Sequence, residues 1–160
     1  MDTWYPDLDG DGFGVGTTGI YSCSQPPDYL AQAGDCDDTN PDTHAGAPEV
    51  NDGLDNQCPG DAGHGLIDEI SGNGGFANPA DLNELSWPAQ TGATGYEIAR
   101  SEDPRFVAGC DLFVSATTSW VDTDSVPPDM GFHYLVRAAQ PNAGSWGADS
   151  AGVERTPACP

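Results

Sequence analysis

A run of aspartates near the start of the chain has the spacing of a calcium-binding loop. Asp7, Asp9 and Asp11 alternate with other residues and are followed directly by a glycine. In an EF-hand-type loop, carboxylates occupy positions 1, 3 and 5, and glycine at position 6 allows a sharp turn. The backbone carbonyl at position 7, here that of Phe13, supplies a further oxygen. Position 12 is Thr18 instead of glutamate, so we expect the remaining ligands to come from another segment.

A second oxygen-rich stretch begins at Asp38 and fits the same register. Asn40 and Asp42 stand at its positions 3 and 5, and Glu49 stands at its position 12. The backbone carbonyl of His44 falls at position 7. This second loop is imperfect, because position 6 is a threonine and a proline stiffens the middle.

A third set of oxygen donors follows, but it is stretched over a longer segment. The sequence therefore indicates that a site exists here without defining its register. The residues that offer oxygens are Asp52, Asp55, Gln57, Asp61, Asp68 and Glu69.

The donor types in these loops favour calcium over copper. Calcium prefers carboxylate and carbonyl oxygens, whereas copper prefers imidazole or sulfur. Only His44 and His64 lie in this part of the chain, and neither has a second histidine at a chelating spacing. We predict roughly two or three calcium ions, with copper less favoured and both histidines as ordinary loop residues.

The loops lie in the more acidic half of an acidic chain. The whole chain has 26 acidic and 4 basic residues and a net charge of -22. Residues 1–70 carry 15 carboxylates and no lysine or arginine. This charge argues against nucleic acid or an anionic membrane as a partner, and no apolar run reaches the roughly 18 residues that span a bilayer. Without bound ions, such a composition is typical of a disordered segment.

From about residue 82 the pattern changes to short runs in which apolar and polar residues alternate. Such runs are typical of half-buried strands, and their regular spacing predicts a Greek-key β-sandwich. Pro127 and Pro128 would separate the last two strands. The predicted strands cover residues 85–87, 96–100, 112–114, 119–122 and 132–137.

The five cysteines leave their pairing open. Cys36 could pair with Cys23 or with Cys58, and Cys110 with Cys159 would attach the end of the chain to the predicted sandwich. One thiol would then be free or bonded to another chain. Since no two cysteines form a CxxC pair, a zinc or redox site is not indicated. Widely separated cysteines beside acidic loops fit an oxidising, extracellular setting.

The first half resembles a known family. The succession DLDGDGFG, GDCDDTNPD, GAPEVNDGLDNQC and GLIDE closely resembles the MopE-type metal-binding motif over about residues 2–70. That motif occurs in secreted and surface proteins and is related in style to thrombospondin type 3 calcium repeats, although its family label carries a copper association. The resemblance implies three ligand groups: Asp7, Asp9 and Asp11 in one loop; Asp35, Asp37 and Asp38, which close it or bridge to a neighbouring ion; and Glu49, Asp52 and Asp55 around another ion.

The second half resembles a fibronectin type III-like domain over about residues 79–160. The segments that carry this resemblance are LSWPAQTGATGYEIARS and FHYLVRAAQPNAGSWGADSAGVER. It implies that Trp87 is the core tryptophan of the second strand and that Tyr134 is the corner tyrosine of the sixth. The cell-attachment tripeptide RGD of that family is absent.

Together these patterns predict a mainly β chain in two parts. A loop-rich, calcium-stapled region would cover residues 1–72 and pack on a fibronectin type III-like β-sandwich over residues 73–160. Nothing at the start resembles a signal sequence, so we interpret the chain as a mature protein or an excised piece. The usual nucleophile motifs are missing and the acidic clusters are explained as calcium ligands, so we expect no enzyme activity.

The predicted function is that of an extracellular calcium-binding structural or adhesive protein, with the chain as the repeating subunit of a surface filament. An exposed edge strand of the sandwich would receive a neighbour's N-terminal segment, which builds a head-to-tail polymer. The alternative is a calcium-dependent carbohydrate- or partner-binding module of a larger secreted protein.

Overall fold

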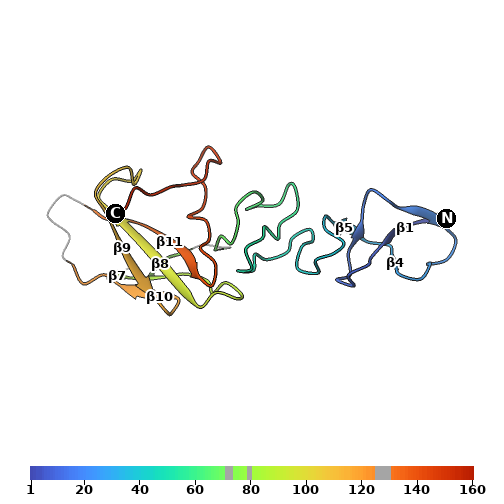
Figure 1. Cartoon of the computed structure of the whole chain (residues 1–160), viewed down its shortest axis with the longest axis horizontal. Helices are drawn as coiled ribbons and strands as arrows, with labels where there is room; N and C mark the ends of the chain where they lie inside the picture. Colours follow the sequence, from blue (N-terminus) through green and yellow to red (C-terminus); the bar gives the residue numbers. More distant parts are fainter. Residues whose placement is uncertain (71–73, 79–80, 125–130) are drawn as a thin grey trace. The chain divides into compact units, whose positions relative to one another are not determined.

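The computed structural model describes residues 1–70, 74–78, 81–124 and 131–160, and within these ranges it consists of strands, turns and loops (Figure 1). The predicted mainly β class is confirmed. Within the described ranges, no helix is long and apolar enough to cross a membrane. The described residues form two compact units. The N-terminal unit comprises Met1–Pro48 and Asp55–Gly65, and the C-terminal unit comprises Glu49–Leu54 and the described part of Leu66–Pro160.

Two predicted features lie outside the described residues. The predicted boundary between residues 72 and 73 falls in the segment 71–73, and the predicted break at Pro127 and Pro128 falls in the segment 125–130. In the described part of the chain, two short stretches that the sequence assigned to the first region, 49–54 and 66–70, belong with the C-terminal unit.

The N-terminal unit is built from very short strands. In one sheet the central strand pairs antiparallel with a neighbour on each side, and a second sheet consists of one parallel pair. The strands are β1 (Asp2–Pro6), flanked by β3 (Ile20–Ser22) and β4 (Tyr29–Leu30), and the pair β2 (Gly14–Val15) and β5 (Ala33–Asp35).

The buried residues of the N-terminal unit are mostly polar. Asp35, Thr43, Asn56 and Gln57 are all buried there, whereas the buried apolar group includes Ala47 and Cys58. A unit with so little apolar core needs covalent or ionic cross-links to stay folded.

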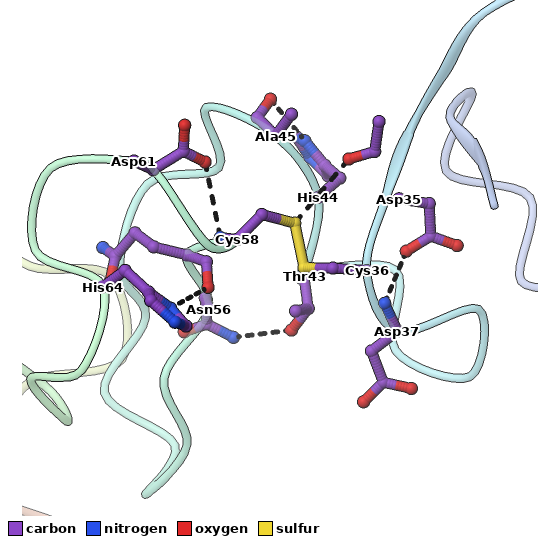
Figure 2. The surroundings of a disulfide bond; sticks show 12 residues. Asp35, Cys36, Asp37, Thr43, His44, Ala45, Asn56, Cys58, Asp61 and His64 are labelled. Atoms are coloured by element: carbon purple, nitrogen blue, oxygen red, sulfur yellow. Dashed lines mark hydrogen bonds between the residues drawn. A yellow bond between two sulfur atoms is a disulfide. The ribbon is translucent and has the colours of Figure 1, made fainter. Parts of the chain in front are cut away.

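The disulfide of this unit joins Cys36 to Cys58, which decides between the two pairings left open by the sequence (Figure 2). It ties the loop after β5 to the segment that carries Asn56 and Asp61. Cys23 is free and exposed. The bond closes a long loop, and by the chain-entropy model such closure is worth about 3 kcal/mol.

The C-terminal unit contains two three-stranded antiparallel sheets. Each predicted strand run overlaps one of their strands, and the second disulfide, between Cys110 and Cys159, attaches the end of the chain to the start of β9 as expected. One sheet has the order β10 (Ser119–Val121), β7 (Asp81–Ser86), β6 (Gly75–Asn78), and the other has the order β11 (His133–Gln140), β8 (Gly95–Ser101), β9 (Cys110–Ser115).

Side chains from both sheets contribute to one apolar core. Leu85 and Trp87 come from β7 and the residue after it, and Tyr96 and Ile98 come from β8. Trp87 is a core residue, as the resemblance implied, and Tyr134 packs against the same cluster. The sandwich topology and the fibronectin type III-like assignment stay predictions.

A buried arginine and its partners connect strands β8, β9 and β11 with the segment that follows β10. The Arg100 guanidinium on β8 donates to Asp111 at 2.9 Å, to Asp122 at 2.9 Å and to Asp124 at 2.7 Å. The Tyr134 hydroxyl donates to the Asp122 carboxylate at 2.8 Å. Burial and the hydrogen bond to this anion raise the pKa of Tyr134 well above its usual value, so the phenol stays protonated.

Candidate metal centre

The first aspartate loop folds as a tight turn held by its own carboxylates. The backbone N–H of Gly10 donates to Asp7 Oδ1 at 2.8 Å, that of Asp11 to Asp9 Oδ1 at 3.2 Å, and that of Phe13 to Asp11 Oδ1 at 2.6 Å. The glycine at loop position 6 has a φ of 95°, a conformation that favours glycine. The loop is therefore the sharp turn that the spacing predicted, and in it these hydrogen bonds engage the Oδ1 atom of each aspartate.

A second segment, the one that follows β5, completes the cluster. Asp38 Oδ1 accepts a hydrogen bond from the backbone N–H of Leu8 at 2.6 Å. One carboxylate oxygen from each of Asp7, Asp9 and Asp38 lies within 4.8 Å of the other two. Carboxylates from two distant parts of the sequence thus converge, as the resemblance implied for Asp38.

Buried carboxylate oxygens without hydrogen-bond donors mark this region. Within the described residues, the Oδ2 atoms of Asp9, Asp11 and Asp35 are buried and accept no hydrogen bond. Burying an anionic oxygen without a partner costs a large fraction of its hydration free energy, so such atoms call for an explanation. A bound cation would satisfy them.

The electrostatics of the cluster also favour a bound cation. Burial raises the pKa of Asp9 above its usual value, and the negative charges of Asp11, Asp7 and Asp38 raise it further. Burial also raises the pKa of Asp35, and repulsion from Asp9, Asp11 and Asp38 adds to it. Neighbouring carboxylates thus repel the charged forms of Asp9 and Asp35, and a divalent cation would offset that repulsion.

The second predicted loop contributes Asp38 to the first centre, and its next residues form a turn of their own. Asn40 Oδ1 accepts from the N–H of Asp42 at 3.2 Å, and the Asn40 amide donates to Thr43 at 2.8 Å. Asp37, whose carboxylate accepts from the Thr39 hydroxyl at 2.7 Å, lies outside the group of three converging carboxylates.

The third set of predicted oxygen ligands is divided between the two units. In the N-terminal unit, Asp61 Oδ2 accepts from the backbone N–H of Cys58 at 3.3 Å (Figure 2). It also accepts from the backbone N–H of Gly46 at 2.8 Å. Asp55 Oδ2 accepts from the N–H of Gly65 at 2.6 Å. These carboxylates hold loop backbones together. Gln57 keeps a buried side-chain oxygen that accepts no hydrogen bond within the described part of the chain.

The remaining predicted ligands, which include the buried Glu69, lie in the C-terminal unit. The buried Asp68 carboxylate accepts from the backbone N–H groups of Asp52 at 2.9 Å and Gly53 at 3.0 Å, and its own N–H donates to Glu49 Oε1 at 2.7 Å. This network fixes a turn with backbone donors.

Both histidines of this half make ordinary loop contacts. The His44 ring stacks on the Phe13 ring with a centroid distance of 4.3 Å and an interplanar angle of 7°. His64 Nδ1 lies 2.9 Å from the Gln57 carbonyl oxygen, which places a proton on Nδ1. Neither ring belongs to the converging group. The stacking of Phe13 on His44 joins the two predicted loops, and no spacing rule in the sequence indicated it.

Comparison with known families agrees with the geometry in part. A family model described as "Putative metal-binding motif" (Cu-binding MopE) matches residues 35–63. The match includes Asp35, Asp38 and the Cys36–Cys58 pair, but it does not include the first aspartate loop. No curated protein and no solved structure matches the chain. The motif indicates metal binding without specifying the metal.

Proposed function

We propose that the N-terminal unit binds calcium at a centre formed by Asp7, Asp9 and Asp38, with Asp11 and Asp35 beside it. The observation that carries this proposal is the convergence of three carboxylates within 4.8 Å next to buried oxygens that accept no hydrogen bond in the described ranges. Calcium takes 6–8 oxygen ligands, so carbonyl groups and water would complete its shell.

The donor chemistry supports calcium over copper. Every side chain at the centre offers carboxylate oxygen, which suits a hard cation, whereas copper sites are built from imidazole or thiolate. His44 is stacked on an aromatic ring, and His64 is hydrogen-bonded to a carbonyl oxygen. Cys36 and Cys58 are consumed in a disulfide and offer no thiolate.

Bound calcium would replace the missing apolar core of the N-terminal unit. Because the ligand cluster needs the folded chain, the free energy of binding adds to the free energy of unfolding. We further propose an extracellular, non-enzymatic role as a structural or adhesive module that associates with itself. Two disulfides support an oxidising setting, and millimolar calcium is typical of extracellular modules.

The test is thermal unfolding with calcium, magnesium, copper or chelator. We expect calcium to raise the melting temperature most, since ligand at a hundred times its dissociation constant adds about 2.7 kcal/mol. Asp9→Asn and Asp38→Asn should lose most of this shift. Asp28→Asn is the matched control, because it removes one charge from the same unit and asparagine tolerates the positive φ at this position.

Three outcomes would contradict the proposal. Equal melting temperatures with calcium and with chelator would contradict the existence of a metal centre. A larger shift with copper would show that copper, not calcium, is the preferred metal. A shift that survives both ligand substitutions would place the ion elsewhere. Counting bound ions by mass spectrometry would then test the predicted number of two or three.

A further inference from the structure

A groove of about 650 Å³ runs through the C-terminal unit beside β6 and β11. Its walls are rich in aromatic side chains, and a single arginine lies among them. The residues used below are Phe76, Trp87, Phe132, Tyr134, Trp146 and Arg155.

Two unpaired strand edges border this groove. In the described part of the chain, β6 and β11 are outer strands of their sheets. The Ala138 carbonyl accepts from the Gly144 N–H at 2.9 Å, so Ala138 directs its backbone groups away from β8. Backbone groups alternate in direction along a strand, so Tyr134 and Val136 direct theirs the same way. The groove therefore offers backbone N–H and C=O groups that can pair with an incoming strand.

The side chains of the groove favour a guest that offers oxygen acceptors. Arg155 lines the groove and forms no salt bridge with the described carboxylates, unlike Arg100, Arg105 and Arg137. Trp87 Nε1 is buried and has no acceptor among the described residues. Arg155 Nε already donates to the Ala148 carbonyl at 3.1 Å. A guest with carbonyl or hydroxyl oxygens would supply acceptors for Trp87 Nε1 and for the terminal nitrogens of Arg155.

The best match on the chain itself is the N-terminal unit. Its outer strand β3 leaves Ile20 41% exposed and Tyr21 74% exposed, which is unusual for large apolar side chains on a strand edge. The unit contains no lysine or arginine, so it brings no cation toward Arg155, and β3 itself offers backbone carbonyls and the hydroxyl groups of Tyr21 and Ser22 as acceptors. The other outer strand, β4, is two residues long and half-buried.

We infer that β3 of a second copy adds to the free edge of β11, with Tyr21 seated among the aromatic side chains of the groove. This inference rests on the self-association in the proposed function, and it specifies the two surfaces that would meet. The contact joins two different surfaces, so repetition would generate a head-to-tail chain of copies.

Cys23 allows a direct test, because it is exposed, free and one residue beyond β3. A benzophenone attached to this thiol in the full chain should, on illumination, cross-link to residues 131–136 or 146–155 of another copy. The yield should rise with protein concentration. Arg155→Glu and Tyr21→Ser should each reduce it about tenfold, whereas Arg105→Glu, which changes an exposed arginine paired with Asp103, should leave it unchanged.

Other outcomes would overturn the inference. Cross-links between two N-terminal units would indicate a symmetric dimer, and links within one chain that are independent of concentration would indicate a fold-back contact. If light scattering detects assemblies but no link reaches the groove, the surfaces are wrong while self-association stands. A monodisperse monomer at millimolar calcium would contradict both the proposed surfaces and self-association itself. The calcium-dependent melting shift would remain a separate result.

Discussion

Carboxylate side chains have two different tasks in this molecule. Asp7, Asp9 and Asp38 converge on a common space, whereas Asp61 and Asp68 accept backbone N–H groups within loops. The two tasks differ in their partners. Backbone donors satisfy a carboxylate inside the chain, whereas converging carboxylates destabilise the fold unless a cation joins them.

The raised pKa of Asp9 and of Asp35 predicts an unusual pH dependence for the metal-free chain. Both carboxyl groups hold their protons more tightly when folded, so their contribution to stability is present at low pH and lost as the pH rises through the raised pKa. With chelator, we expect hydrogen-exchange protection of residues 7–14 to increase as the pH falls from 7 toward about 4, the usual carboxyl pKa.

Saturating calcium should reverse this pH dependence, so that protection falls as the pH falls, because protons compete with the ion for the same oxygens. Asp9→Asn should weaken the dependence in chelator, whereas Asp28→Asn should keep it. A metal-free loop that loses protection as the pH falls would show that carboxylate repulsion does not dominate there.

At the scale of elements, the Cys36–Cys58 bond positions one of the two ligand segments. Cys36 lies between Asp35 and Asp37 and two residues before Asp38, so the disulfide limits the freedom of these carboxylates. The strands of the unit are too short to do this alone, since the longest has five residues. In the proposed centre, covalent closure would therefore organise these carboxylates before an ion binds.

Replacing both cysteines, as in Cys36→Ser with Cys58→Ser, should therefore weaken calcium binding as well as stability. We expect about a tenfold loss of affinity by calorimetric titration, because the ion must then order the loop itself. The matched control is Cys110→Ser with Cys159→Ser, which removes the bond of the C-terminal unit. If both pairs change the affinity equally, the effect reports general destabilisation instead of ligand positioning.

At the scale of the whole molecule, the two units are stabilised by different interactions. The C-terminal unit has an apolar core and a buried arginine with three aspartates, whereas the N-terminal unit buries mainly polar side chains. Calorimetry should therefore show two unfolding transitions, and chelator should lower only the one that belongs to the N-terminal unit. A single transition that shifts as a whole would mean that the units unfold together.

Sequence spacing alone predicted the features that depend on neighbouring residues. The first aspartate loop turns at its glycine, and strands β7 to β11 overlap the runs in which alternation predicted strands, because turn geometry and strand alternation are local properties. Strand β6 was not predicted. The excess of carboxylates over basic residues also identified metal binding as the chemistry to test.

Only the tertiary structure decided which distant residues meet. It brought Asp38 to the first loop and paired Cys36 with Cys58. It also placed the carboxylates of Asp61 and Asp68 where they accept hydrogen bonds from backbone N–H groups. It also left one edge of β11 without a partner strand in the described part of the chain. Spacing cannot determine such contacts, because many long-range pairings cost nearly the same chain entropy, and only packing of the complete fold distinguishes them.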